Sequence, residues 1–158
     1  MNILVLGDIV GESAVKRVKE ILPKAIKEND INFVIANGEN SADGMGITSK
    51  IFKDLMCAGV NVVTMGNHTW GKKDIFNIIE NKNLLRPANY PKDVLGNGYG
   101  IYEYNNKKIA VINLIGRVDM NVLSENPFIV VEEIINKIKD SVDIIIVDFH
   151  AEATAEKI

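Results

Sequence analysis

The stretch VNVVTMGNHTW (residues 60–70) joins a short apolar run to a loop that holds an asparagine and a histidine side by side. Its first residues are mostly β-branched, which is typical of a buried strand, and glycines flank the loop that follows. Asn67 and His68 are therefore predicted to stand just beyond the end of a strand. The chain has only two histidines, so the placement of one of them here is informative.

Similar apolar runs alternate with longer segments of helical period along the rest of the chain. Strands are predicted at 2–7, 32–36, 60–65 and 143–149, a hairpin at 99–104 and 108–116, and helices at 15–26, 49–58, 73–80 and 127–139. An alternation of this kind implies parallel strands joined by crossover helices, as in α/β domains. The irregular stretch at 86–98 is expected to be a surface loop, because prolines and glycines interrupt it.

Local signals place several helix ends. Thr48 is a predicted N-cap and Gly59 a predicted left-handed C-terminal cap of the helix at 49–58. Asn126 and Pro127 have the residue types of an N-cap and a first helical position. Pro23 is expected to kink or divide the first helix, because proline lacks the amide hydrogen that an inner helical position needs.

Composition limits the classes of function. The 158 residues suit one domain, 47% of them are hydrophobic, and 18 basic against 21 acidic residues give a net charge of -3. Such a balance offers no strong positive field for long nucleic acid, but it does not exclude a small phosphorylated ligand. The lone Cys57 cannot form an intramolecular disulfide and is expected to be buried. The start of the chain lacks the features of a signal peptide, and no apolar stretch reaches the ~20 residues of a membrane span, so a cytoplasmic protein is expected.

Polar side chains follow each of the predicted parallel strands. The residues at these strand ends are Asp8, Glu39, Asn40, Asn67, His68 and His150. In open α/β sheets, ligands bind outside the carboxyl ends of the strands. Oxygen and imidazole donors that meet there suit manganese, iron or zinc, and a pair of such ions activates phosphate esters for hydrolysis.

Each of these residues also has a purely structural interpretation. Asp8 has the residue type of a helix N-cap, Asn40 and Asn67 are common in turns, and His150 beside apolar residues has the setting of a buried core histidine. Independent turns and caps would not be expected to share one edge of a sheet. The shared position of these residues at the strand ends therefore favours a metal site.

Six blocks of sequence identify a family. They are GDIVG (7–11), NGEN (37–40), GMGIT (44–48), TMGNHTW (64–70), RPANYP (86–91) and VDFHAEAT (147–154). Together they resemble the YmdB-like family of calcineurin-type metallophosphoesterases, bacterial 2′,3′-cyclic-nucleotide phosphodiesterases, over essentially the whole chain. The resemblance implies an α/β sandwich with αββα layers and two divalent metal ions, iron or manganese, with zinc and magnesium as the alternatives.

The resemblance also implies roles for the residues at the strand ends. Asp8 would bind one metal ion with help from Asn40, Glu39 would bridge both ions, and Asn67 with His150 would bind the second. His68 would be the catalytic imidazole. The expected reaction converts 2′,3′-cyclic nucleotides to 3′-nucleotides, so the partner is a small cyclic nucleotide. Long nucleic acid and membranes are not expected as partners, and a homo-oligomer is left open.

Some positions depart from the family pattern. Calcineurin-type enzymes generally carry Asp-x-His after the first strand, where this chain has Val10, a change that its family shares and offsets with Asn40. Gly71 stands where many members have aspartate. The family also continues into a Gly-Thr-His-Thr-His segment that gives a histidine to each metal. Residues 1–158 are therefore expected to be a C-terminally incomplete metallophosphoesterase domain that binds metal weakly and hydrolyses substrate slowly or not at all.

Other interpretations remain beside this one. The alternative function is a non-catalytic nucleotide-binding or regulatory module derived from the same fold. A dinucleotide-binding domain and a P-loop nucleotide hydrolase are not indicated, because GDIVGES has the glycine spacing of neither. Trp70 is interpreted as a buried packing residue in preference to a platform for a nucleobase. Arg86 is interpreted as a brace for its loop in preference to a phosphate ligand.

Overall fold

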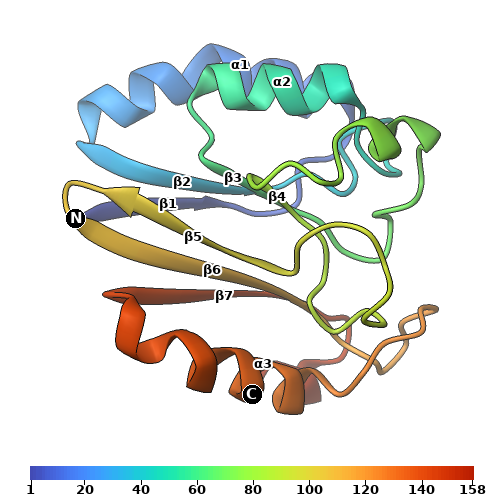
Figure 1. Ribbon diagram of the computed structural model, residues 1–158. Helices are drawn as coiled ribbons and strands as arrows, with labels where there is room; N and C mark the ends of the chain where they lie inside the picture. Colours follow the sequence, from blue (N-terminus) through green and yellow to red (C-terminus); the bar gives the residue numbers. More distant parts are fainter.

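Two sheets lie face to face between helices in the computed structural model, which describes residues 1–158 (Figure 1). Helices α1 (Gly11–Glu28) and α2 (Ser49–Ala58) cover the outer face of one sheet, and α3 (Pro127–Ile138) covers the outer face of the other. The layers therefore follow the order helix, sheet, sheet, helix. This confirms the predicted αββα sandwich.

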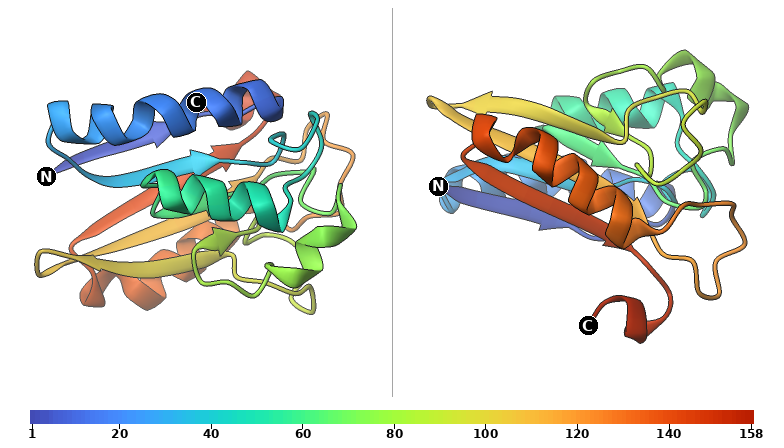
Figure 2. Two further views of the ribbon diagram at one scale, coloured as in Figure 1. Left: turned by 90° about the horizontal axis from the view of Figure 1, so that it is seen from above. Right: turned by 60° about the horizontal axis from the view of Figure 1, so that its bottom comes forward.

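The first sheet is entirely parallel. Its strands lie in the order β1 (Asn2–Leu6), β2 (Ile31–Asn37), β3 (Val62–Thr64) and β4 (Leu84–Leu85). The pairs Leu6↔Ala36 and Asn37↔Thr64 bring the carboxyl ends of β1, β2 and β3 to the same level. The loops that follow them gather at one end of the sandwich, on the right in Figure 1 and in the left view of Figure 2.

The second sheet combines a hairpin with one parallel strand. Strands β5 (Tyr99–Tyr104) and β6 (Lys107–Ile115) are antiparallel, and β7 (Ile144–His150) pairs with β6 in parallel. Asn105 and Asn106 both have positive φ, 47° and 62°, which a two-residue turn of this hand requires. The predicted hairpin is confirmed, and β7 ends at His150 on the same side as the loops of the first sheet.

The predicted caps are confirmed. Thr48 Oγ1 accepts a hydrogen bond from Ile51 N at 3.3 Å, and Gly59 takes the left-handed conformation with φ of 111°. Asn126 Oδ1 accepts from Phe128 N at 3.0 Å at the start of α3.

One helix prediction was wrong in part and another was wrong. Helix α1 is continuous over 18 residues with Pro23 inside it, so the proline does not divide it. The expected helix at 73–80 is a short 3₁₀ helix, η1 (Lys73–Asn77). Two further 3₁₀ turns, η2 (Lys139–Ser141) and η3 (Thr154–Glu156), flank β7.

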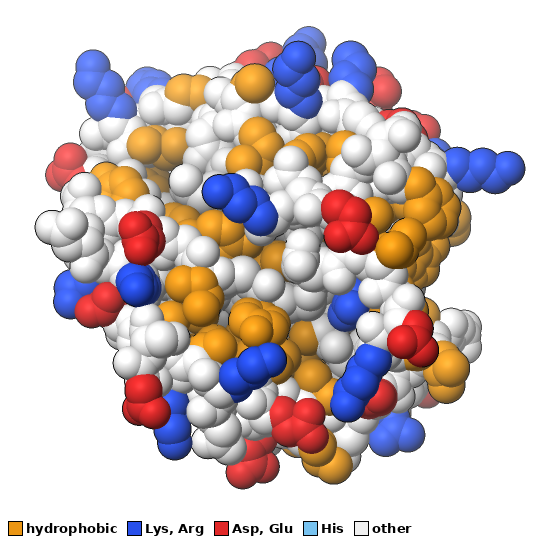
Figure 3. Space-filling model, in the orientation of Figure 1, with side chains coloured by type: hydrophobic (Ala, Val, Ile, Leu, Met, Phe, Trp, Pro, Cys, Tyr) orange, Lys and Arg blue, Asp and Glu red, His pale blue; other side chains and the backbone are white.

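Apolar side chains fill each space between layers. The largest cluster joins α1 and α2 to the first sheet, a second lies between the two sheets around Ile35 and Val111, and a third joins α3 to the second sheet. Cys57 was expected to be buried but is exposed. The face shown in Figure 3 carries acidic and basic side chains interspersed. None of the helices combines the length and apolar composition that crossing a membrane requires.

Candidate active site

The polar residues predicted at the strand ends lie at one end of the sandwich. Asp8 follows β1, Glu39 and Asn40 follow β2, and His150 ends β7. Asn67 and His68 follow β3 in a loop at the same end (Figure 2). The parallel first sheet and the parallel strand of the second sheet therefore deliver their side chains to a shared region.

Glu39 stands at the centre of this region. Its side chain is completely buried, and its Oε2 accepts a hydrogen bond from the backbone N–H of His68 at 3.0 Å. His150 Nδ1 lies 2.7 Å from Glu39 Oε1, without the angles of a hydrogen bond, so Oε1 is a buried oxygen with no hydrogen-bond partner. The Glu39 carboxylate raises the pKa of the His150 imidazole, and burial opposes this rise.

Asn40 connects Asp8 to His68. Its Nδ2 donates to both carboxylate oxygens of Asp8, at 2.9 and 3.0 Å, and its Oδ1 lies 2.5 Å from His68 Nδ1. Because an amide oxygen only accepts, this contact requires the proton of the imidazole to be on Nδ1. Proton exchange is then left to Nε2. Asp8 is exposed, so solvent reaches this side of the site.

Asn67 lies between Gly66 and His68 in the same loop and is half-buried. Its side chain is not part of the hydrogen-bonded network that joins Asp8, Asn40, His68 and Glu39.

The side chains present fit a divalent cation. Two carboxylates, two amides and an imidazole are the donors that manganese, iron and zinc accept. Oε1 of Glu39 is a buried carboxylate oxygen that accepts no hydrogen bond and faces the His150 ring at 2.7 Å. No three carboxylate, imidazole or thiolate side chains among residues 1–158 form a complete ligand cluster by themselves. The amides of Asn40 and Asn67 would therefore have to contribute. The individual ligand assignments stay predictions.

The sequence did not predict the residues that pack against the Glu39 carboxylate and fix its position. A Cβ on Gly66 would lie 2.5 Å from both carboxylate oxygens of Glu39, so only glycine fits there. The Tyr90 hydroxyl donates to the Gly66 carbonyl at 2.9 Å, and burial raises the pKa of Tyr90 to about 12. The glycine in GNH was visible in the sequence, but nothing near it pointed to Tyr90.

Contacts between the sheets hold the strand ends in place, and sequence reasoning missed these as well. Thr64 Oγ1 on β3 donates to Asp148 Oδ2 on β7 at 2.5 Å. Asn113 on β6 is fully buried and donates from Nδ2 to the carbonyls of Met65 and Leu85, at 2.7 and 2.9 Å. An asparagine inside an apolar strand was the available signal, because a buried amide needs partners.

Comparison with known proteins identifies the family of the chain. A sequence model of the family described as YmdB-like protein matches residues 4–158. The chain belongs to the YmdB-like family. It is 45% identical, over its whole length, to the 2′,3′-cyclic-nucleotide 2′-phosphodiesterase of Bacillus subtilis, of which it covers 60%.

Two solved structures resemble the YmdB-like chain closely. One is a hypothetical protein from Thermus thermophilus, with a TM-score of 0.92 and 33% identity, matched over 99% of this chain and 60% of that one. The other is a phosphatase from Mycoplasma pneumoniae, with a TM-score of 0.90 and 39% identity, matched over 98% of this chain and 57% of that one. The YmdB-like chain thus spans about 60% of the length of the relatives it matches.

The prediction for Arg86 of the YmdB-like chain is confirmed, and the prediction for Trp70 is not. The Arg86 guanidinium is buried and donates to the carbonyls of Pro87 at 2.7 Å and Val94 at 3.2 Å, which confirms that it braces its loop. Burial lowers its pKa. Trp70 is 37% exposed, so the expected buried role was wrong.

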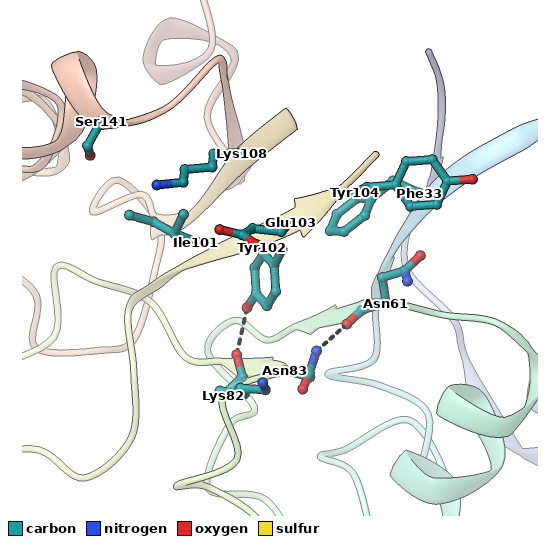
Figure 4. A pocket seen from close by; sticks show the side chains of 10 residues that line it. All are labelled: Phe33, Asn61, Lys82, Asn83, Ile101, Tyr102, Glu103, Tyr104, Lys108 and Ser141. Carbon is teal, nitrogen blue, oxygen red and sulfur yellow. Dashed lines mark hydrogen bonds between the residues drawn. The ribbon is translucent and has the colours of Figure 1, made fainter. Parts of the chain in front are cut away.

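The largest cavity of the YmdB-like chain, about 570 Å³, lies at the opposite end of the sandwich (Figure 4). Its wall includes Phe33 at the start of β2 and Lys108 at the start of β6. Tyr102 O–H donates to the Lys82 carbonyl at 2.6 Å within it, as Figure 4 shows. None of the residues predicted for the active site lines this cavity, so its size does not identify the site of chemistry.

Proposed function

We propose that this YmdB-like protein hydrolyses 2′,3′-cyclic nucleotides to 3′-nucleotides with two divalent metal ions, iron or manganese. The observation that carries the proposal is the junction at Glu39, whose carboxylate contacts groups from the loop after β3 and from the end of β7. The Bacillus subtilis relative, named as a 2′,3′-cyclic-nucleotide 2′-phosphodiesterase, supports the choice of substrate.

The strand-end residues would hold the metal ions. Asp8 with Asn40 would serve one ion and Asn67 with His150 the other, while Glu39 would contact both. When bound, such a pair of ions supplies Lewis-acid stabilisation to a phosphate ester during in-line displacement. Glu39 suits the shared position because its buried carboxylate has an oxygen free of hydrogen bonds.

His68 would act as the general acid. Asn40 fixes its ring through Nδ1, which leaves Nε2 to donate a proton to the departing 2′ oxygen when the phosphorus–oxygen bond breaks. Water supplies the oxygen that joins phosphorus, and the phosphate stays on the 3′ oxygen. The backbone N–H of His68 is held by Glu39, so the catalytic imidazole and the metal-binding carboxylate are positioned together.

A hydrolysis assay with 2′,3′-cyclic AMP and manganese tests the proposal, run on residues 1–158 and on the protein at the full length of its relatives, because residues 1–158 alone are expected to turn over slowly or not at all. We expect 3′-AMP as the product. His68→Ala should lose about a hundredfold or more in rate, in line with the usual contribution of a general acid, and Asn67→Ala should lose activity because it removes a proposed metal ligand. Asn136→Ala on the exposed face of α3 is the matched control and should retain activity. The proposal is wrong if both site variants keep full activity or if 2′-AMP accumulates.

The alternative is a non-catalytic nucleotide-binding or regulatory module. It is favoured by the lack of three charged or imidazole ligands in one cluster among residues 1–158. The hydrolysis assay distinguishes the two functions, and calorimetric titration of residues 1–158 with manganese tests the expected weakening of the metal centre. Binding of 3′-AMP with no turnover at either length supports the module. Tight binding of manganese at two sites per chain contradicts the expectation of a weakened metal centre.

A further inference from the structure

A small apolar pocket of about 220 Å³ opens beside the His68 loop. It is lined by Trp70, Tyr90, Pro91, Val94, Val122 and Leu123. No carboxylate, amide or cationic side chain contributes to its wall. The pocket is separate from the large cavity of Figure 4, with which it shares no residue.

Two residues of this pocket, Trp70 and Tyr90, connect it to the candidate active site. Trp70 is two residues beyond His68, so their Cα atoms are at most about 7 Å apart. Tyr90 also contacts the loop of the site, because its hydroxyl donates to the carbonyl of Gly66, the residue that packs against Glu39. A ligand with its phosphate at Asn67 and His68 therefore has this pocket within the reach of a nucleoside.

Aromatic and aliphatic surface is left open at the pocket. Trp70 stacks on Phe76 with ring centroids 5.8 Å apart and an interplanar angle of 25°, which fixes the plane of the indole. The indole remains 37% exposed and Leu123 is 82% exposed. Apolar surface that gathers beside a polar site is typical of a ligand-binding groove.

We infer that this pocket holds the base of the cyclic nucleotide, with the base stacked on Trp70. The inference rests on the proposed function and adds the means by which its substrate is recognised. Because the Tyr90 hydroxyl is already bonded to Gly66 and the other wall residues are apolar, the pocket recognises ring area and not a pattern of hydrogen bonds. Purines therefore bind more tightly than pyrimidines, and adenine and guanine are distinguished little.

The fluorescence of Trp70 provides a direct test, because it is the only tryptophan in the chain. The probes are 3′-AMP, adenosine and ribose 3-phosphate, titrated into residues 1–158 with manganese present. We expect saturable quenching by 3′-AMP and by adenosine, and none by ribose 3-phosphate, which has no base. Leu123→Asp should weaken adenosine binding roughly tenfold, the usual scale for loss of an apolar base contact.

Ile101→Asp is the matched control, because Ile101 is 44% exposed and lines the distant cavity. This variant should bind adenosine as the unmodified chain does. The inference is overturned if adenosine does not quench, or if Leu123→Asp binds it unchanged. It is also overturned if Leu123→Asp only converts a dimer to a monomer in sedimentation, since the pocket would then be a subunit contact.

The outcome is independent of the hydrolysis assay. Quenching of residues 1–158 by 3′-AMP, without hydrolysis of 2′,3′-cyclic AMP by the protein at the full length of its relatives, supports the base pocket and contradicts the proposed catalysis. Hydrolysis without any quenching supports the catalysis and contradicts the base pocket.

Discussion

Gly66 limits the position of the Glu39 carboxylate. An alanine there would place its Cβ 2.5 Å from both carboxylate oxygens, so Gly66→Ala has to displace a side chain that is fully buried. We expect Gly66→Ala to weaken manganese binding roughly tenfold to a hundredfold, as other changes to the residues behind metal ligands do. Calorimetric titration with manganese measures the loss.

Gly7→Ala is the matched control for this prediction. It adds the same methyl group directly before Asp8, but nothing lies within 4 Å of the added Cβ. Manganese affinity should therefore be unchanged in Gly7→Ala. Equal affinities for Gly66→Ala and the unmodified chain would show that Glu39 does not need its observed position.

Tyr90, which is buried, and Tyr102, which is half-buried, predict how the free energy of unfolding depends on alkaline pH. Burial raises the pKa of Tyr90 from 10.0 to about 12, and it raises the pKa of Tyr102 as well. A group whose pKa is higher in the folded state contributes stability that is complete below its unfolded pKa and is lost as pH rises through the folded pKa. We therefore expect Tyr90 to cost the folded state about 2 kcal/mol between pH 10 and pH 12.

Urea denaturation at pH 9 and pH 11 measures this effect. Tyr90→Phe should be about 1 kcal/mol less stable at pH 9, because the Gly66 carbonyl loses a donor, and should lose less stability on going to pH 11. Tyr102→Phe serves as the comparison at the other end of the sandwich. The same pH response in Tyr90→Phe as in the unmodified chain would contradict the prediction.

At the scale of single residues, the sequence predicted which groups meet but not what holds them. Asp8, Glu39 and His68 were visible because each follows an apolar strand, and strand ends share one edge of a parallel sheet. Gly66 and Tyr90 were not visible as a pair, because the residues are 24 positions apart and their contact depends on how a loop returns. No local pattern encodes such a contact.

Helix α1 stays continuous across a proline, Pro23. Pro23 lies on the exposed face within 18 helical residues and removes the hydrogen bond that its amide would give one turn back. Pro23→Ala should therefore stabilise the chain, by about 1 to 3 kcal/mol, less than the full helix penalty because proline also restricts the unfolded chain. Urea denaturation followed by circular dichroism measures the gain.

Lys27→Ala, on the exposed face of the same helix, is the control. Its free energy of unfolding should change by no more than about 0.5 kcal/mol. A loss of stability in Pro23→Ala would mean that the proline shapes the helix in a way that the chain requires.

At the scale of elements, the predictions succeeded where the signal was local. Thr48, Gly59 and Asn126 were predicted as caps because capping depends on neighbouring backbone groups. Strand β4 was missed because two residues cannot show a period, and η1 was taken for a longer helix because its apolar pattern does not reveal where hydrogen bonding stops. The continuity of α1 across Pro23 depends on packing against the sheet, which outweighs local preference.

At the scale of the whole molecule, the candidate site needs both sheets. Glu39 and His68 come from loops of the first sheet, while His150 comes from β7 of the second. Their distances therefore depend on how the sheets are joined at this end. Thr64 Oγ1 joins them directly by donating to Asp148 Oδ2, two residues before His150.

Thr64→Val tests whether this contact holds the two sheets at the site. Valine has nearly the shape of threonine but leaves an Asp148 oxygen without its donor, so we expect a loss of about 1 to 3 kcal/mol in the free energy of unfolding. Manganese binding should weaken as well, because β7 carries His150. Thr154→Val, on an exposed residue after β7, should change neither quantity. If Thr64→Val keeps full stability and full manganese affinity, apolar packing between the sheets is sufficient to position His150 against Glu39.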